Sequence, residues 1–294
     1  WLICEESYWG VPAHLYLQKS GSGLPDVTEP TVDLFAAQTA SLLAWADYLL
    51  GDEFDGVSPL LRDRIFAEVD RRVLTPCLER NDFWWMGFNF ESGTYTRRVN
   101  NWNPWICSSW LSAVLLLERD EDRRLAAVHK IMRALDNFLN PHPRDGGCDE
   151  GPGYWGHAGA SLFDCLEMLH SVSQGKINLY QQPLIREMGA YIYKAHIHAN
   201  YFVNFADAAP VVTPPADLVH RFGTRTQDAR LQQFGTYLAN RLGPDFRNKD
   251  LGMDRRLAEL FNYQNLKNTQ SKAPLLRDAW LPDSQLMFAR SEEG

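Results

Sequence analysis

The sequence has few cysteines, and none of them lies in a metal-binding pair. Five cysteines occur among 294 residues, and none shows the CxxC spacing of structural zinc sites. Their odd number leaves one thiol over in any set of disulfides. Cys107 and Cys165 fall in apolar helical runs, where cysteine acts as a small buried hydrophobe. We therefore expect no metal and no cofactor in this segment.

Long apolar runs and targeting signals are also lacking. No stretch approaches 18 consecutive apolar residues, so no membrane span is expected. The opening WLICEESYWG lacks the basic start and cleavage pattern of a signal peptide. Because the chain starts at Trp1 and not at Met, an export signal removed by processing would not be visible.

Basic blocks are missing as well. The chain carries 29 Lys and Arg against 37 Asp and Glu, a net charge of −8. General nucleic-acid binding needs a basic surface that releases counterions, so we expect no nucleic-acid partner. An acidic ligand would need a local basic site, for which Arg97, Arg98 and Arg144 are the candidates. Each of them could equally be an ordinary solvated arginine.

Helical periodicity covers most of the chain. Apolar residues make up 45% of it, including 10 Trp, which is ample for a large core. Proline near helix starts and glycine after helix ends set the expected boundaries. We predict helices over 2–19 with a break at Gly10–Pro12, 31–51 ending at Gly51, 58–81, 100–118 capped by Asn101 or Asn103, 121–139, 160–173, 183–196, 214–222, 227–241 and 253–261.

This succession predicts an all-α fold of helical hairpins. A stacked solenoid should repeat every ~34–47 residues, and no such repeat is present. The alternative, an incomplete (α/α)5–6 toroid over 1–280, fits the aromatic and glycine-rich connectors at helix starts. The ending LPDSQLMFARSEEG predicts a β-strand, so we expect 281–294 to begin a β-rich domain that continues in a longer parent protein.

One loop concentrates residues that can do chemistry. The stretch NPHPRDGGCDEGPGYWGHAGASLFD, from 140 to 164, combines glycines, prolines, acids, Tyr154 and His157 ahead of an apolar helical run. A helix beginning near Tyr154 would place its positive end beside these side chains. Such a loop suits an acidic substrate.

Four segments together carry a family resemblance. NNWNPW at 100–105, DGGCDEGPGYWGHAG at 145–159, YFVNFADA at 201–208 and the terminal strand resemble the heparinase II/III-like polysaccharide lyases, which include oligoalginate lyases. The resemblance implies a helical toroid followed by a β-sandwich, acting on uronic-acid polysaccharide in the bacterial periplasm or outside the cell. It leaves open a metal ion in the following domain.

The family's β-elimination needs a group that neutralises the uronate carboxylate, a base and an acid. The amides of Asn100 and Asn101 can bind the carboxylate as its charge grows. Tyr154 can act as acid, or as base if nearby positive charge lowers its pKa, and His157 can share the proton transfer. Asn101 could instead be a helix cap, Tyr154 a wall aromatic and His157 a structural hydrogen-bonding residue.

Further side chains complete the expected site. Glu150 is a weaker catalytic candidate, since it could simply order the glycine-rich loop. Several tryptophans could stack on sugars or belong to the core, namely Trp9, Trp102, Trp105 and Trp155. The sequence departs from the family where Trp102, and not His, follows Asn101. His14 could replace that histidine if folding brings it close, and another family histidine would lie beyond Gly294.

Two other functions stay open at this point. A glycoside hydrolase or unsaturated uronyl hydrolase on the same architecture would need two carboxyl groups across a cleft, for which Asp149 or Glu150 could pair with Asp207. A non-catalytic glycan-binding module would need only the tryptophans and arginines. Which polysaccharide is bound cannot be read from the sequence.

Overall fold

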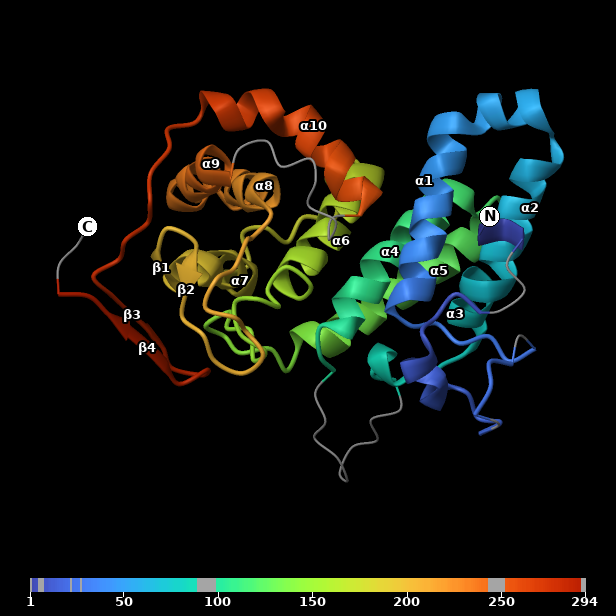
Figure 1. The fold of residues 1–294 in the computed structure, drawn as a ribbon, viewed down its shortest axis with the longest axis horizontal. Helices are drawn as coiled ribbons and strands as arrows, with labels where there is room; N and C mark the ends of the chain where they lie inside the picture. Colours follow the sequence, from blue (N-terminus) through green and yellow to red (C-terminus); the bar gives the residue numbers. More distant parts are fainter. Residues whose placement is uncertain are drawn as a thin grey trace. The chain divides into compact units, whose positions relative to one another are not determined.

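The computed structural model describes residues 2–4, 8–21, 23–26, 28–88, 99–242 and 252–291. It is mostly helical, with ten α-helices and a few short strands in these residues, which confirms the all-α class. The chain divides into two compact units, 1–141 and 142–294 (Figure 1). Each unit is described by itself.

In the first unit, the long α1 (Leu34–Val57) starts at a side-chain cap, because Asp33 accepts a hydrogen bond from Ala36 N. We expected Gly51 to end this helix, and the regular helix does break at the neighbouring Leu50, where the backbone kinks. A second helical segment then continues to Val57, beyond the expected end. Gly51 lies against the Arg62 guanidinium, so the missing Cβ leaves room for that side chain.

Helices α2 (Leu60–Val69) and α3 (Thr75–Glu79) are joined by a π-helical turn, Asp70–Leu74. Then follow α4 (Trp102–Leu117) and α5 (Glu121–Leu139), the second with the predicted bounds. Helix α4 is apolar on all sides because α1 and α5 both pack on it.

The predicted helix over 2–19 was wrong. In the described residues of that stretch, 2–4 and 8–19, the helical structure is limited to two short 3-10 turns, Leu2–Cys4 and Pro12–Leu17. Pro12 cannot donate a helical hydrogen bond, and the N–H of Val11 donates to the Asp33 carboxylate, which draws this segment onto the start of α1. A further 3-10 turn, Trp84–Met86, precedes α4.

The second unit contains α6 (Gly159–Val172), α7 (Pro183–Lys194), α8 (Ala216–Thr226), α9 (Ala229–Leu242) and α10 (Met253–Asn268). Helices α8 and α9 lie side by side (Figure 1). Glycine permits this close approach, since a Cβ on Gly223 would lie 2.5 Å from Gln232 N, and one on Gly235 would lie 2.5 Å from His220 N. Helix α10, which packs on this pair, runs seven residues past its predicted end at Phe261.

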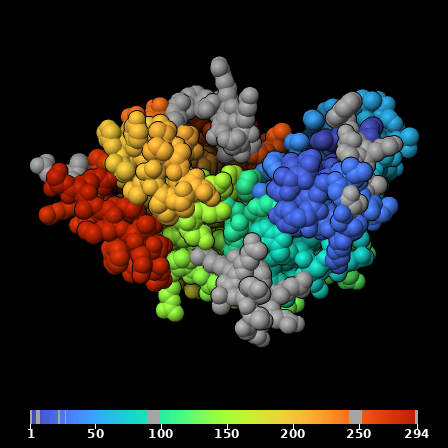
Figure 2. Space-filling model, turned by 60° about the horizontal axis from the view of Figure 1, so that its bottom comes forward, coloured from blue at the N-terminus to red at the C-terminus, as the bar shows by residue number. Residues whose placement is uncertain are grey.

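Two small antiparallel hairpins complete this unit. Strand β1 (His196–His198) pairs with β2 (Tyr201–Phe202), and β3 (Asp278–Leu281) pairs with β4 (Leu286–Ala289). The terminal strand was predicted, but its partner β3 was not. The β3–β4 turn is bound to the central loop, because Asp145 accepts hydrogen bonds from the backbone of Asp283 and Ser284. Figure 2 shows this hairpin, in red, adjoining the yellow-green atoms of the same unit.

Candidate functional site

The central loop of the second unit, 142–158, is built from successive turns. Helix α6 begins only at Gly159, so the prediction of a helix from near Tyr154 was wrong. Gly151 has a φ of +88°, and a Cβ there would lie 2.6 Å from Phe205 O. The loop therefore turns on glycine where it meets the segment that carries Asp207.

A cleft of about 490 Å³ opens beside this loop. Four lining residues can do chemistry: Tyr154, His157, Asp207 and Arg255. The rings of Tyr154 and His157 have centroids 6.3 Å apart and planes inclined by 62°. Both side chains are partly exposed. Tyr154 and His157, which are expected to share proton transfer, thus border the same cleft. The carboxylate of Asp207 and the guanidinium of Arg255 line it too.

Arg255 was not singled out from the sequence. It comes from the first turn of α10, where it lies in no recognisable motif. Its Nε donates to Asp164 Oδ2 at 2.8 Å, and its Nη2 donates to Gly156 O at 2.8 Å and to Ser161 Oγ at 3.0 Å. The side chains of Arg255 and Asp164 are both nearly buried. The guanidinium is therefore held in one place at the wall of the cleft, next to the loop that carries Tyr154.

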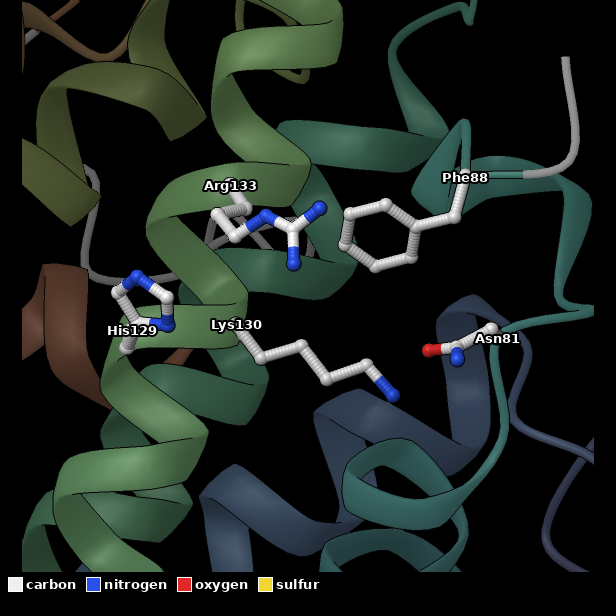
Figure 3. Close-up of a pocket in the computed structure, with 5 residues that line it drawn as sticks. All are labelled: Asn81, Phe88, His129, Lys130 and Arg133. Carbon is white, nitrogen blue, oxygen red and sulfur yellow. The ribbon is translucent and has the colours of Figure 1, made fainter. Parts of the chain in front are cut away.

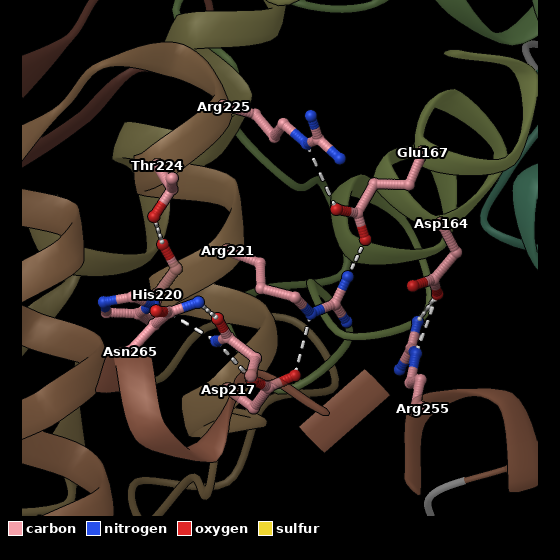
Figure 4. Close-up of polar contacts among 10 residues, drawn as sticks. Asp164, Glu167, Asp217, His220, Arg221, Thr224, Arg225, Arg255 and Asn265 are labelled. Atoms are coloured by element: carbon pink, nitrogen blue, oxygen red, sulfur yellow. Dashed lines mark hydrogen bonds and ion pairs between the residues drawn. The ribbon is translucent and has the colours of Figure 1, made fainter. Parts of the chain in front are cut away.

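Behind Arg255 lies a network of buried charges (Figure 4). Arg221 forms ion pairs with Glu167 and with Asp217, the second at 2.8 Å. Burial raises the pKa of Asp164, against the opposing charge of Arg255. Burial also raises the pKa of Asp217 to about 7, although Asn262 donates a hydrogen bond to it, and lowers the pKa of Arg221 to about 10.

Residues expected to bind the substrate carboxylate lie in the first unit. Asn101 is buried at the start of α4 without a side-chain capping bond. The cap comes instead from Asn100, whose Oδ1 accepts from Trp102 N at 3.1 Å. Asn103, the other expected cap, is buried and donates to Trp85 O and Ala134 O. Asn100 is partly exposed, so its amide nitrogen is the more accessible donor.

His14 does come close to this helix start, as its expected role required. Its ring lies edge-on to Trp102, with centroids 4.6 Å apart. Its Nδ1 lies 2.7 Å from Asp33 Oδ2. The ring of Trp102 packs against Trp84, at 5.1 Å. His14, Trp102 and Asn100 thus belong to one polar and aromatic region of the first unit.

The remaining tryptophans and Arg144 differ in exposure. Trp9 and Trp155 are buried, so their rings belong to the core, although Trp155 also lies at the wall of the cleft. The indole of Trp155 donates to Met188 O. Trp102 and Trp105 are partly exposed. Arg144 is exposed and binds Asp283 through its backbone N–H.

Predictions about several charged side chains remain. Asp207 lines the cleft, whereas Asp149 and Glu150 do not. Arg97 and Arg98 lie outside the described residues. Among the residues that the structure describes, no three His, Cys, Asp or Glu side chains are grouped so as to hold a metal ion.

Cysteine behaves as expected in the described ranges. Cys77, Cys107, Cys148 and Cys165 are buried free thiols, and Cys4 is exposed. Burial raises the pKa of Cys77 and of Cys107, which keeps both thiols protonated and unreactive.

No helix in the described part of the chain is both long and apolar enough to cross a membrane. Comparison of the chain with models of known protein families gives no match, and comparison with curated proteins gives none.

Proposed function

We propose that this chain is a polysaccharide lyase that cleaves uronic-acid-containing polysaccharide by β-elimination, in the manner of the heparinase II/III-like enzymes it resembles. One observation carries the proposal. Tyr154 and His157, the expected acid and base, border a single cleft that also holds the guanidinium of Arg255. A phenol, an imidazole and a cation can supply the acid, the base and the neutralising charge that β-elimination from a uronate needs.

The reaction removes the proton at C5 of the uronate ring. The electron pair of that C–H bond becomes the C4–C5 double bond, and the bond from C4 to the glycosidic oxygen breaks. In the proposal, Tyr154 and His157 divide these transfers: one accepts the C5 proton and the other gives a proton to the leaving oxygen. General acid and base catalysis of this kind contributes about 10²–10⁴-fold in rate.

Negative charge builds on the carboxylate as the C5 proton leaves. Arg255 is the cation on the cleft, and its bonds to Asp164, Gly156 and Ser161 hold it in position before substrate arrives. A donor that needs no rearrangement stabilises developing charge most effectively. Asn100, His14 and Trp102 lie in the first unit, and their expected contacts with the carboxylate and the sugar stay predictions.

The wider expectations follow from the same proposal. The helices would form an incomplete (α/α) toroid, a β-sandwich would follow in the parent protein, and the protein would act in the periplasm or outside the cell. The substrate would be an acidic polysaccharide of the glycosaminoglycan or alginate type. These points stand on the resemblance of the four sequence segments.

An ultraviolet assay for the new C4–C5 double bond tests the proposal. The chain would be incubated with heparan sulfate, hyaluronan, chondroitin and alginate. Absorbance should grow on at least one polymer and fall at least about 100-fold in Tyr154→Phe. Tyr48→Phe, which removes an exposed hydroxyl from α1, should behave like the unchanged protein.

The hydrolase alternative rests on Asp207 at the cleft, and the same assay separates it. New reducing ends without absorbance, abolished by Asp207→Asn and not by Tyr154→Phe, would mean hydrolysis. Binding with neither product would mean a glycan-binding module. Either result would overturn the proposed lyase.

A further inference from the structure

A second hollow lies in the first unit, and no part of the proposed chemistry uses it. It measures about 390 Å³ and is lined by Asn81, Phe88, His129, Lys130 and Arg133. The last three come from α5, and Asn81 and Phe88 come from the segment after α3. Figure 3 shows the nitrogen ends of Lys130 and Arg133 and the amide of Asn81 directed into the space beside the Phe88 ring.

The lining is basic in a protein with a net charge of −8. None of the described residues that line it is a carboxylate, and within the described ranges no ion pair or hydrogen bond involves the side chains of His129, Arg133 or Asn81. The guanidinium of Arg133 lies 5.4 Å from the centre of the Phe88 ring. His129 and Arg133 are four residues apart and so lie on one face of α5.

Lys130 is fixed in place by the backbone. Its Nζ donates to Leu78 O at 2.9 Å and to Arg80 O at 2.6 Å, which leaves one N–H of the ammonium for another acceptor. Burial lowers its pKa, and the charge of Arg133 acts in the same direction, while Cys77 and Asp82 oppose them. Asp82 is itself paired with Arg80 and Lys19. The ammonium is thus a positioned donor at the base of the hollow.

We propose that this hollow binds a sulfate or carboxylate group carried by an acidic saccharide. Arginine and lysine together suit oxyanions, because both supply charged donors at different angles. The volume favours a carried group over a bare ion, since about 300–1,000 Å³ is the range of sites that enclose small organic ligands. That the carrier is a saccharide rests on the proposed function; the anion itself follows from the lining.

Binding measurements test the site without any turnover. The full chain carrying Tyr154→Phe would be titrated with inorganic sulfate, a sulfated uronate tetrasaccharide and an unsulfated one, by calorimetry and amide chemical shifts. Arg133→Gln should weaken saccharide binding by at least about tenfold, the size of one charge-assisted hydrogen bond. His129→Gln should weaken it further when combined with Arg133→Gln.

Arg119→Gln is the matched control. Arg119 is also an exposed arginine stacked over a phenylalanine of the first unit, 4.7 Å from the centre of Phe66, but outside the hollow. The substitution Arg119→Gln removes the same charge as Arg133→Gln and should leave saccharide binding unchanged. Equal weakening by both variants would mean that net charge alone causes the effect and would overturn the site.

Binding of sulfate with no tighter binding of either saccharide would overturn the saccharide assignment, even if the lyase assay were positive. Saccharide binding lost in Arg133→Gln would support the site even if no lyase activity were found.

Discussion

The Nδ1 of His14 lies 2.7 Å from Oδ2 of Asp33, and this contact joins the N-terminal segment to the start of α1. The same carboxylate accepts hydrogen bonds from Val11 N and Ala36 N. The Asp33 side chain is only 1% exposed, against 18% for His14. A buried acid that orients a half-buried imidazole is the arrangement that fixes which ring nitrogen faces outward. His14 is therefore held edge-on to Trp102 by groups behind it.

Asp33→Asn should destabilise the first unit more than His14→Gln does. The amide that replaces the Asp33 carboxylate has an N–H group facing the three donors, Val11 N, Ala36 N and His14 Nδ1. At least one buried donor then loses its acceptor, which should lower the free energy of unfolding by about 1–3 kcal/mol. His14→Gln removes only one of the three bonds and should cost less than about 1 kcal/mol. Urea unfolding of both variants measures the difference. Equal losses would mean that Asp33 matters only as the partner of His14.

Arg255→Gln should lower the free energy of unfolding by about 3–5 kcal/mol, because it leaves the Asp164 carboxylate buried without its ion pair. Replacing both partners with apolar side chains, Asp164→Leu with Arg255→Met, should recover most of that loss. The proposed lyase activity should stay low in the double variant, since the cation is gone. Chemical denaturation and the ultraviolet assay together separate the two effects. Activity that recovers along with stability would show that Arg255 has no part in the reaction.

Two glycines of the central loop form a matched pair. Gly151→Ala should cost about 1–3 kcal/mol, because its φ of +88° is unfavourable for alanine and the new Cβ would meet Phe205 O and the Ala208 Cβ at 2.6 Å. Gly153→Ala should be nearly neutral, since the nearest atom would lie at 3.4 Å. Thermal unfolding compares the two. Similar costs would mean that the loop does not depend on the conformation at Gly151.

Much of the helical architecture could be predicted from local sequence. The bounds of α5 were correct because Asp120 caps it, accepting from Arg123 N, and apolar residues recur at helical spacing up to Leu139. The errors arose where tertiary contacts override local signals. The stretch 2–19 has helical spacing, yet the hydrogen bond from Val11 N to the Asp33 carboxylate draws it onto the start of α1.

The candidate site was only partly predictable for the same reason. Tyr154 and His157 lie three residues apart, so their shared cleft could be anticipated from one stretch of sequence. Arg255 is 99 positions from the Gly156 carbonyl it binds, and no local pattern marks such a pairing. Trp155 shows why a residue expected at the site can turn out to be buried. Its burial depends on partners from other helices, such as Phe222 and Met188, which local sequence does not reveal.

The attachment of the β3–β4 turn should weaken in acid. Burial alone would raise the pKa of Asp145, but hydrogen bonds from Ser284, Gly147 and Asp283 lower it below its ordinary value. A depressed carboxylate pKa contributes stability that is fully present above the unfolded value, about 3.9, and is lost as the pH falls through the folded one. The amide resonance of Ser284, which donates to Asp145, should therefore shift below that pH. Asp145→Asn, in which an N–H group faces these donors, should cost about 2–3 kcal/mol at neutral pH and show no such titration. A wild-type titration at the ordinary aspartate value would mean that these bonds do not favour the charged form.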